Sequence, residues 1–586
     1  MQYTSKATYE FISKQTNDPI VERKICRVSG AEFPIFQSEI DFYDKISPTF
    51  ADKKFQIPTP TLCPEERERR RRMHRNERHY YRRTCQFSGE PTVSLHTPDK
   101  PRKVYKNKIW FSDKRDAMDY AQDISSDIGF TEQFLHLEEQ VPTPDMMRVD
   151  SENCDYTSGT WFCKNCYMIC ASEYAENCMY SKLCQTASYV LDSSNIFNSE
   201  HIYQSYNLKE CNNCIALSNS IGCYHSHFSD SLIWCSYCLF CTNLQNKSYH
   251  IFNKPISKQE FEQAYERYLT SNIGMREGKA ILSDCLSRAV SKYVETERCE
   301  NSCGNELFDC KNVIMGYSVN EWEDCRYCAI GEKVKSVQDC NNMYVNPELC
   351  YEVMWAMQSY NCHFSCYIFE NSRDIWYSVN CHNCHNCFWC IGLRSKSYCI
   401  FNKQYSKEEY ELRVAEIIDG MIVRWERWEF FDYILAPFGY NESVAQDIYP
   451  LTKQEALARW YRRSEYSNDP KIPDNAQVIK VVELSDNERD SLSSDPTILR
   501  QVIICAESWR PFMIQKSELS FYHQHKLPLP RIHPDVRYLH RVRARPSKAL
   551  YLRNCDCCGK NILSVYPHEY KWKIYCEECY NKEIYS

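Results

Sequence analysis

The hydrophobic and polar positions of residues 151–400 follow no helical period. Short segments of Cys, Asn, Ser, Tyr and Ile recur at intervals of roughly 20 residues, as in the run NCHFSCYIFENSRDIWYSVNCHNC. Strand-prone residues alternate there with Asn and Ser, which favour turns. Short units of this kind cannot bury an apolar face alone and are typical of stacked repeats. The pattern predicts a mainly β protein with two β-solenoid-like segments built from short rungs.

A helix is predicted at the end of each cysteine-rich segment. Ser257 and Ser406 are followed three residues later by Glu260 and Glu409, and this spacing forms a capping box at a helix start. Apolar residues follow at helical spacing, namely Phe261, Tyr265 and Tyr268 in the first copy and Tyr410, Val414, Ile417 and Met421 in the second. We expect both helices to cap their segments, because a stack of repeats must cover its last apolar layer.

The chain contains an internal duplication. Residues 235–262 align without a gap with residues 384–411, and 15 of the 28 positions are identical. Near the two ends of the chain, residues 33–43 match 512–522, and residues 57–67 match 527–537. We therefore predict four domains: a basic-helix module with a degenerate ribbon (20–150), two cysteine-rich solenoids with capping helices (151–275 and 285–430), and a second basic-helix module with an intact zinc ribbon (431–586).

Four cysteines near the C-terminus have the spacing of a zinc ribbon. Cys555 and Cys558 form one C-x-x-C pair, and Cys576 and Cys579 form a second pair after 17 intervening residues. A hairpin between two such pairs brings four thiolates around Zn²⁺, which is the cofactor that we predict. Four thiolates close the coordination shell, so this zinc would be structural and not catalytic.

The N-terminal ribbon retains one of these four positions. Cys85 aligns with Cys555, whereas Ser88, Lys106 and Ile109 stand where the other three ligands would be. One thiolate cannot hold a structural zinc, so we expect this ribbon to contain no metal.

Two further half-ribbons show the same loss of ligands. Cys26 and Cys63 occupy the same places as Cys505 and His533, and their partner positions hold Ser29, Glu66, Ser508 and Val536. A metal-ligand pair is conceivable there, but we interpret these thiols as core or surface residues.

The central cysteines allow three interpretations. The run C-x-x-C-x-x-C-x-x-C and its shorter echo comprise Cys381, Cys384, Cys387 and Cys390, and Cys235, Cys238 and Cys241. A ferredoxin-type cluster requires a longer last spacing and a following proline, whereas Ile391 follows here. Zinc is a second alternative. We favour the third, in which the thiols pack as small apolar groups inside the rungs.

An arginine-rich helix is predicted after Pro64, which suits a first helical position. Guanidinium groups bind phosphate bidentately, and the tyrosines nearby can stack on bases. The alternatives are an acidic protein surface, including one of this chain, and a solvated helix face. The candidate nucleic-acid contacts are Arg67, Arg69, Arg70, Arg71, Arg72, Arg75, Arg78, Tyr81, Arg82 and Arg83 in the first copy and Arg537, Arg541, Arg543 and Arg545 in the second.

Composition narrows the classes of protein. The 586 residues carry a net charge of −7 and 36 cysteines, with no G-x-G-x-x-G or G-x-x-x-x-G-K-[ST] motif. No apolar run reaches the length of about 20 residues that spans a bilayer, and the start lacks a secretory signal pattern. We expect a cytoplasmic location (host cytoplasm or virion if the protein is viral), where thiols stay reduced.

Several motifs occur together in the order seen in one known family. They are C-x-x-S-G within 26–33, the P-x-P turn and R-N-E-R helix within 57–78, K-S-Y-C-I-F-N-K within 397–410, and Y-C-E-E-C-Y within 574–585. The chain resembles an uncharacterised cysteine-rich zinc-ribbon and solenoid family of candidate-phyla bacteria and giant DNA viruses, sometimes labelled "CaiB/BaiF". Glu66 and Val536 stand where that family usually has cysteine. The resemblance implies an architecture and no activity.

Together these features favour a non-enzymatic zinc-binding scaffold that contacts RNA or DNA through its arginine-rich helices. A structural assembly protein, such as a virion component that binds other protein chains, is the first alternative. A metal or redox protein ranks last, because no nucleophile–base arrangement and no H-E-x-x-H motif is present. The partner is thus nucleic acid or an acidic protein surface, and the oligomeric state is left open.

Overall fold

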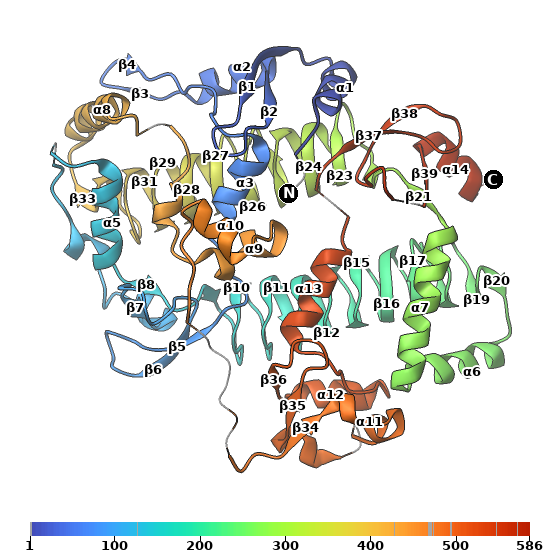
Figure 1. The fold of residues 1–586 in the computed structure, drawn as a ribbon. Helices are drawn as coiled ribbons and strands as arrows, with labels where there is room; N and C mark the ends of the chain where they lie inside the picture. Colours follow the sequence, from blue (N-terminus) through green and yellow to red (C-terminus); the bar gives the residue numbers. More distant parts are fainter. Residues whose placement is uncertain are drawn as a thin grey trace. The chain divides into compact units, whose positions relative to one another are not determined.

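The computed structural model describes residues 3–125, 127–426, 428–466, 472, 474–492, 495–546, 548–570 and 572–585. The chain divides into two compact units, each assembled from three separate stretches (Figure 1). Unit 1 comprises 1–145, 292–466 and 546–570, and unit 2 comprises 146–291, 467–545 and 571–586. Each unit therefore contains one cysteine-rich segment together with parts of the flanking modules.

Unit 2 contains a twelve-stranded, barrel-like sheet that we call the first stack. Its neighbouring strands pair in parallel, apart from a last antiparallel strand, and each residue pairs with one 12 positions further on, as Ser158 does with Cys170. The strands are β9 (Arg148–Val149), β10 (Ser158–Trp161), β11 (Cys170–Glu176), β12 (Lys182–Leu191), β13 (Ser194–Phe197), β14 (Glu200–Tyr203), β15 (Tyr206–Lys209), β16 (Asn212–Ile221), β17 (His227–Asp230), β18 (Ser236–Leu239), β19 (Ser248–Ile251) and β20 (Lys254–Pro255).

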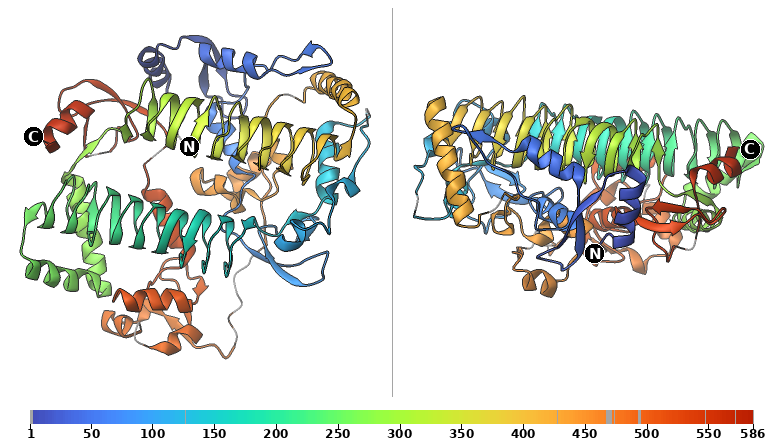
Figure 2. Two further views of the ribbon diagram at one scale, coloured as in Figure 1. Left: turned by 180° about the vertical axis from the view of Figure 1, so that it is seen from behind. Right: turned by 90° about the horizontal axis from the view of Figure 1, so that it is seen from above.

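Unit 1 contains a second barrel-like sheet of twelve strands, the second stack. Most of its register steps are also 12 residues. The first step contains 11, as Thr296 pairs with Leu307, and two later steps contain 13, as Asn341 pairs with Met354 and Tyr360 with Arg373. The strands are β22 (Thr296–Glu297), β23 (Cys303–Phe308), β24 (Lys311–Arg326), β25 (Ala329–Lys335), β26 (Asn341–Tyr344), β27 (Tyr351–Met357), β28 (Tyr360–Phe369), β29 (Arg373–Trp376), β30 (Val379–His382), β31 (His385–Phe388), β32 (Ser397–Ile400) and β33 (Lys403–Gln404). Figure 2 shows each stack from two further directions.

The repeat length differs from the one that the sequence suggested. The predicted interval of roughly 20 residues was wrong, since the register repeats every 12 residues throughout the first stack. The prediction of a mainly β chain with helices at the ends of its cysteine-rich segments is confirmed.

A left-handed backbone conformation at every third residue explains the unusual composition. From Asn153 to Phe252, every third residue has a positive φ, and the series includes many asparagines. Asn tolerates this region better than most residues, because its short polar side chain can bond locally. In the first stack, each residue of the buried cluster directly follows such a position, as Cys154 follows Asn153. Asparagine and cysteine are thus abundant because one suits the bends and the other the narrow interior.

Both predicted capping helices form. Helix α6 (Lys258–Leu269) begins with the capping box of Ser257 and Glu260, and α8 (Lys407–Val423) begins where the Ser406 hydroxyl accepts a hydrogen bond from the backbone N–H of Glu409. Helix α6 contacts β18 and β19, and α8 contacts β32. Helix α7 (Asn272–Arg288), which the sequence pattern did not reveal, follows α6 and packs against it.

The flanking modules consist of short helices and hairpins. The N-terminal elements are α1 (Lys6–Thr16), β1 (Ile20–Ile25), β2 (Glu32–Phe36), α2 (Gln37–Ile46), β3 (Thr49–Phe50), β4 (Lys53–Lys54), α3 (Pro64–Arg72), β5 (Tyr81–Thr84), β6 (Pro91–Ser94), β7 (Val104–Tyr105), α4 (Asn107–Trp110), η1 (Ala117–Tyr120), α5 (Phe130–Gln140) and β8 (Thr143–Pro144). The later elements are β21 (Val290–Lys292), η2 (Tyr433–Leu435), η3 (Tyr440–Glu442), α9 (Val444–Ile448), α10 (Lys453–Ala458), β34 (Val478–Lys480), η4 (Val481–Glu483), α11 (Asp486–Leu492), η5 (Pro496–Arg500), β35 (Val502–Ile504), β36 (Pro511–Phe512), α12 (Lys516–Gln524), α13 (Pro534–Ala544), β37 (Tyr551–Asn554), β38 (Asn561–Ser564), β39 (Lys573–Tyr575) and α14 (Glu577–Tyr585). Across the described ranges, no helix combines the length and apolar character needed to cross a membrane.

Candidate functional site

The four C-terminal cysteines form a metal-binding geometry. Cys555 and Cys558 lie at the turn of the β37–β38 hairpin, and Cys576 and Cys579 lie at the start of α14. Their four sulfur atoms all lie within 4.8 Å of one another, so the group can hold a metal ion. Cys555 and Cys576 are buried, whereas Cys558 is exposed, so one edge of the group faces solvent. In the part of the chain that the structure describes, no other group of three or more such ligands is this close.

In the N-terminal ribbon and in the half-ribbon of Cys505, a backbone N–H donates a hydrogen bond to the cysteine sulfur. In the N-terminal ribbon, the Cys85 sulfur accepts a hydrogen bond of 3.3 Å from the backbone of Lys106. In the module that contains Cys505, the sulfur accepts one of 3.2 Å from the backbone of His533. Lys106 and His533 both stand at the third ligand position and immediately precede a helix. Each of these buried sulfurs thus has a hydrogen-bond donor within its own module.

The first half-ribbon also lacks a ligand set. The Ser29 hydroxyl lies 3.7 Å from the Cys63 sulfur, and Cys26 and Cys63 are both buried. Glu66, at the fourth position, instead accepts hydrogen bonds of 2.9 Å from Arg69 and 2.7 Å from the Tyr3 hydroxyl. Its carboxylate is thus committed to other partners, which agrees with the interpretation of these thiols as core residues.

The arginine-rich helix α3 is buried, contrary to its expected role on a surface. Six of the ten residues predicted to bind nucleic acid in this copy are buried arginines: Arg67, Arg69, Arg70, Arg71, Arg72 and Arg75. Tyr81 is also buried, and its hydroxyl donates a hydrogen bond of 2.5 Å to Glu442. The prediction that these seven side chains contact phosphates or bases was therefore wrong for this structure. Arg78 and Arg83 are half-buried and Arg82 is exposed.

Acidic side chains of the same unit surround α3. Asp339, which is fully buried in the second stack, lies 2.9 Å from Arg67 and 3.4 Å from Arg71. Glu429 lies 3.1 Å from Arg70, and Glu68 pairs with Arg72 at 2.7 Å. An isolated buried guanidinium would be very costly, so the partners account for its burial. The acidic surface that the sequence analysis left as an alternative is thus inside this chain.

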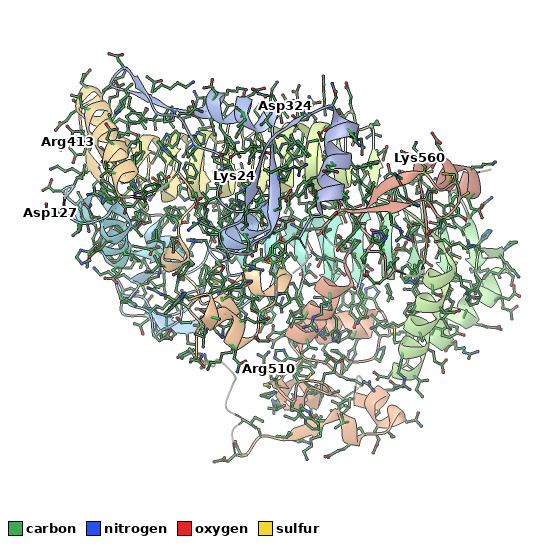
Figure 3. The ribbon with its side chains drawn as sticks, turned by 45° about the horizontal axis from the view of Figure 1, so that its top comes forward. Lys24, Asp127, Asp324, Arg413, Arg510 and Lys560 are labelled. Carbon is green, nitrogen blue, oxygen red and sulfur yellow. The ribbon has the colours of Figure 1, made fainter. Side chains whose placement is uncertain are left out.

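The charges of α3 and its partners shift each other's pKa. Burial opposes ionisation of Glu429, but Arg70 and Arg27 outweigh burial and lower its pKa to about 2. Burial also opposes ionisation of Glu68, and Lys548 and Arg72 again outweigh it and lower the pKa. These carboxylates are therefore ionised in the folded protein over the physiological range. For comparison, Arg413 on α8 lies at the surface and pairs with Glu409 across one helical turn (Figure 3).

Helix α13 in unit 2 repeats the ion pairs of α3. Arg537 lies 3.1 Å from Asp192 and Arg541 lies 3.0 Å from the same carboxylate, which is fully buried in the first stack. Arg537 and Arg541 stand 470 positions after Arg67 and Arg71. Arg537 is buried, Arg541 is half-buried, and the Arg545 guanidinium lies over the ring of Tyr206 at 4.9 Å. Of the four arginines predicted to bind nucleic acid here, Arg543 alone is exposed.

Aromatic residues complete the same arrangement in both units. The Arg67 guanidinium lies 5.2 Å from the ring of Tyr327, and the Arg537 guanidinium lies 5.1 Å from the ring of Tyr180. Tyr327 and Asp339 stand 147 positions after Tyr180 and Asp192. The duplicated helix thus docks on the duplicated stack through the same set of side chains in each unit.

The central cysteines line the buried cores of the stacks. Cys381, Cys384, Cys387 and Cys390 are fully buried, and each thiol donates to a backbone carbonyl, as Cys384 does to His382 at 3.2 Å. The thiols of Cys235, Cys238 and Cys241 do the same. Among the described residues, these seven do not form a ligand group as compact as the C-terminal one. Their burial and their hydrogen bonds are those expected of thiols packed as small apolar groups.

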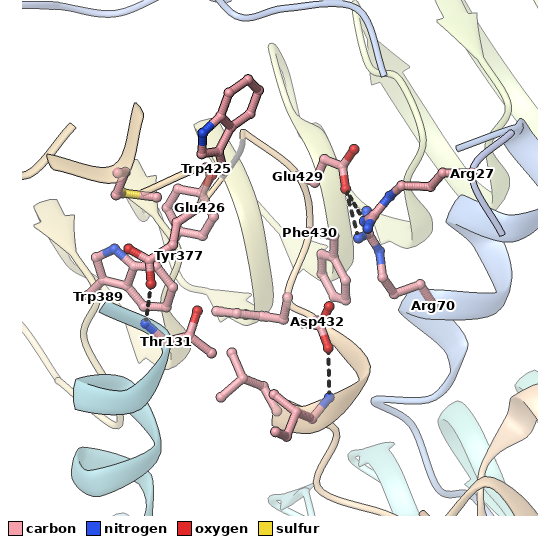
Figure 4. Close-up of a pocket in the computed structure, with 14 residues that line it drawn as sticks. Arg27, Arg70, Thr131, Tyr377, Trp389, Trp425, Glu426, Glu429, Phe430 and Asp432 are labelled. Carbon is pink, nitrogen blue, oxygen red and sulfur yellow. Dashed lines mark hydrogen bonds and ion pairs between the residues drawn. The ribbon is translucent and has the colours of Figure 1, made fainter. Parts of the chain in front are cut away.

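A pocket of about 280 Å³ lies in unit 1 beside the end of α8 (Figure 4). Tyr377 and Trp389 stack at 4.7 Å on its inner side, and Trp425 stands exposed at its rim. On the opposite side of the pocket, the Glu429 carboxylate forms an ion pair of 2.7 Å with Arg27. Local motifs gave no sign of this pocket, since its lining comes from distant segments: Arg27, Arg70, Thr131, Tyr377, Trp389, Met421, Trp425, Glu426, Glu429, Phe430, Phe431, Asp432, Ile434 and Leu435.

The acidic partners of the arginine helices were also missed by sequence reasoning. Asp192 and Asp339 stand within the cysteine-rich segments, where no charge pattern distinguishes them. One signal was available, because both aspartates stand at equivalent places in the duplicated stacks, each three residues before an asparagine. A buried aspartate retained in both copies, opposite an arginine pair retained in both copies, would have predicted the contact.

Comparison with known proteins does not place this chain in a family. No family model matches it, and no curated protein is similar. Among solved structures, one chain from Desulfovibrio desulfuricans G20, described as a provisionally assigned acetyltransferase, has 10% sequence identity and a TM-score of 0.10. The match covers 41% of the present chain and 63% of that one, so the present chain spans less than two thirds of its length.

Proposed function

We propose that this protein is a non-enzymatic scaffold in which two β-solenoids, each held by an internally docked arginine helix, present faces for binding other protein chains. A zinc ion at Cys555, Cys558, Cys576 and Cys579 would stabilise the C-terminal ribbon. The observation that carries the proposal is the burial of α3 and α13 against acidic residues of their own units. Because their arginines pair with carboxylates of the stacks, α3 and α13 hold the flanking modules against the stacks.

The register of the two stacks supports the solenoid interpretation. Each strand pairs in parallel with one about a dozen residues further on, and the backbone bends at a left-handed residue every third position. Four such bends within twelve residues return the chain to the start of the next rung. Stacked rungs of this kind form elongated and regular surfaces, which repeat proteins use for binding.

The chemistry of the metal group supports a structural role. Four thiolates fill the tetrahedral shell that Zn²⁺ prefers, so no position stays open for water or substrate. The closed shell therefore favours a scaffold over a zinc hydrolase. The spacing of the four cysteines and their mutual approach within 4.8 Å suit zinc.

Exposed aromatic residues on the first stack supply a candidate binding face. Phe162 and Tyr174 stand one register step apart, are exposed, and stack with ring centroids 5.0 Å apart. Trp234 belongs to the same series of bends and is 56% exposed. Aromatic side chains contribute strongly at protein interfaces, because they bury a large area at little entropic cost.

Affinity purification of the full chain from its native cells tests the proposal. We expect a protein partner that is retained by the wild type and lost with Phe162→Ser and Tyr174→Ser together. Leu412→Ser, at an exposed apolar position on α8, is the matched control and should retain the partner. Retention of every partner by the double variant would contradict the proposed face. Arg82 and Arg543 are the exposed members of the predicted nucleic-acid contacts. If RNA or DNA is recovered with the wild type and lost with Arg82→Gln and Arg543→Gln together, the protein is a nucleic-acid scaffold and the proposed function is wrong.

A further inference from the structure

We propose that His201 and His525 form a second metal site, which takes a divalent transition-metal ion such as Zn²⁺ or Ni²⁺ and joins α12 to the first stack within unit 2. His201 stands at the start of β14, and His525 directly follows the last residue of α12. Their facing atoms, Nδ1 of His201 and Nε2 of His525, lie 3.1 Å apart.

The distance between the two nitrogens suits a shared ion. Zinc–nitrogen bonds of about 2.0–2.1 Å place two ligand nitrogens about 2.9 Å apart at a right angle and about 3.3 Å apart at the tetrahedral angle. The observed 3.1 Å lies between these values. The two nitrogens therefore already have the separation that a shared ion would require. Without an ion, one imidazole N–H donates a hydrogen bond to the other ring.

Neighbouring side chains hold both rings in position. The ring of His201 stacks on Tyr189 at 4.8 Å, and the ring of His525 packs against Phe521 at 4.5 Å. The second nitrogen of His201, Nε2, lies 3.5 Å from the Glu200 carboxylate. A carboxylate on the far nitrogen is the usual support of a metal-binding histidine, because it leaves the near nitrogen unprotonated and directed at the ion.

The site is accessible from solvent. The two histidines are half-buried, so an ion can enter from solvent and complete its shell with water.

Metal titration of the full chain, already loaded with zinc, tests this site. Calorimetry with Ni²⁺ as the probe should show that the wild type binds one Ni²⁺ ion per chain. A chelator assay after the titration should show that the zinc is still bound, so that the Ni²⁺ has not replaced it. His201→Asn should weaken this binding by at least about tenfold, because loss of even an outer-shell partner usually costs about 10–100-fold in metal affinity. Asn is compatible with the backbone there, because φ is +56° and Asn177 and Asn213 occupy equivalent positions.

A matched control separates loss of a ligand from a structural effect. His225→Asn makes the same change two register steps away, at a bend with φ of +46°, and should bind Ni²⁺ as the wild type does. His525→Gln should weaken binding as strongly as His201→Asn. Equal affinity of His201→Asn and the wild type, equal weakening by the two Asn variants, or no second ion in the wild type would each overturn the proposal.

Discussion

The two copies of the flanking module both dock an arginine helix on a stack, but the residues around the docked helix differ. The N-terminal copy contains no complete metal-ligand set among its described residues, and its helix α3 buries five arginines against several carboxylates. The C-terminal copy has four clustered cysteines, whereas its helix α13 buries Arg537 and half-buries Arg541. Both retain an arginine pair on one buried aspartate. The shared ion pairs therefore define the docking, and the two copies differ in what surrounds it: a cysteine group that can hold a metal ion in one, and additional charge in the other.

The largest expected effect concerns the metal support. Cys576→Ser should release the metal and unfold the C-terminal ribbon, since zinc contributes roughly 10–16 kcal/mol to the folding of small zinc domains. Cys85→Ser, the matched change in the N-terminal ribbon, should cost only about 1–2 kcal/mol, because it removes one buried thiol and no metal. Metal analysis and hydrogen exchange of both ribbons measure the difference. A ribbon that stays folded and protected in Cys576→Ser would show that metal is dispensable there.

The next effect concerns the buried aspartates. Asp339→Asn leaves the buried Arg67 without its carboxylate partner and Arg71 with Glu352 at 3.5 Å, and it should cost about 3–5 kcal/mol, the usual result of removing one partner of a buried ion pair. Asp192→Asn should destabilise unit 2 by less, because the buried Arg537 keeps Glu518 at 3.3 Å and Arg541, which loses the Asp192 carboxylate, is only half-buried. Hydrogen exchange in each unit should report the loss locally.

A compensating variant sharpens this test. Arg67→Met combined with Asp339→Leu removes both charges and should recover part of the lost stability, since apolar replacement of a buried pair is often neutral or favourable. If Asp192→Asn lowers the stability of unit 2 more than Asp339→Asn lowers that of unit 1, the prediction is wrong. The docking of α13 would then depend on its few ion pairs more strongly than the docking of α3 does.

A smaller effect should appear on acidification. Burial lowers the pKa of His74 and His363 in unit 1 to about 3 and that of His525 in unit 2 to about 4, all below the ordinary value of about 6.5. Between these pKa values and 6.5, the unfolded chain therefore binds more protons at these histidines than the folded chain does. Stability should be unaffected by these groups above pH 6.5 and should fall from there toward pH 3–4. Denaturant titrations between pH 7.5 and 4.5 measure this, and His74→Phe should flatten the decline in unit 1.

The smallest effect concerns the thiols of the stacks. Cys387→Ala and its equivalent Cys238→Ala should each cost about 1–2 kcal/mol and leave the metal content unchanged. Equal effects are expected because both side chains are fully buried and donate to a backbone carbonyl. Loss of metal from either variant, measured by elemental analysis, would mean that the central cysteines ligate an ion after all.

Local sequence signals were enough to predict the elements that depend on neighbouring residues. The capping box of Ser257 and Glu260 fixed the start of α6, and the C-x-x-C pairs fixed the metal group. Such features depend on residues within one turn or one hairpin. The presence of zinc and of a partner stays a prediction.

Features that depend on distant residues could not be predicted in this way. The environment of Arg67 is set by Asp339, which stands far along the chain in a segment that looks uncharged. The arginines of α3 were therefore predicted to lie at the surface, whereas they are buried. The repeat length was missed for a related reason: each short step of three residues carries little periodic signal. The second stack also contains two 13-residue steps, so the two cysteine-rich segments align only with gaps.

Those longer steps bear on how this kind of chain can change length during evolution. At each of them, two successive residues adopt a left-handed conformation, Val345 with Asn346 and Glu370 with Asn371. The additional residue is absorbed at the bend, and the strands on either side keep their pairing and their inward positions. A gene encoding this chain can thus gain or lose single codons at the bends, or a whole rung at once, without changing which side chains face the core.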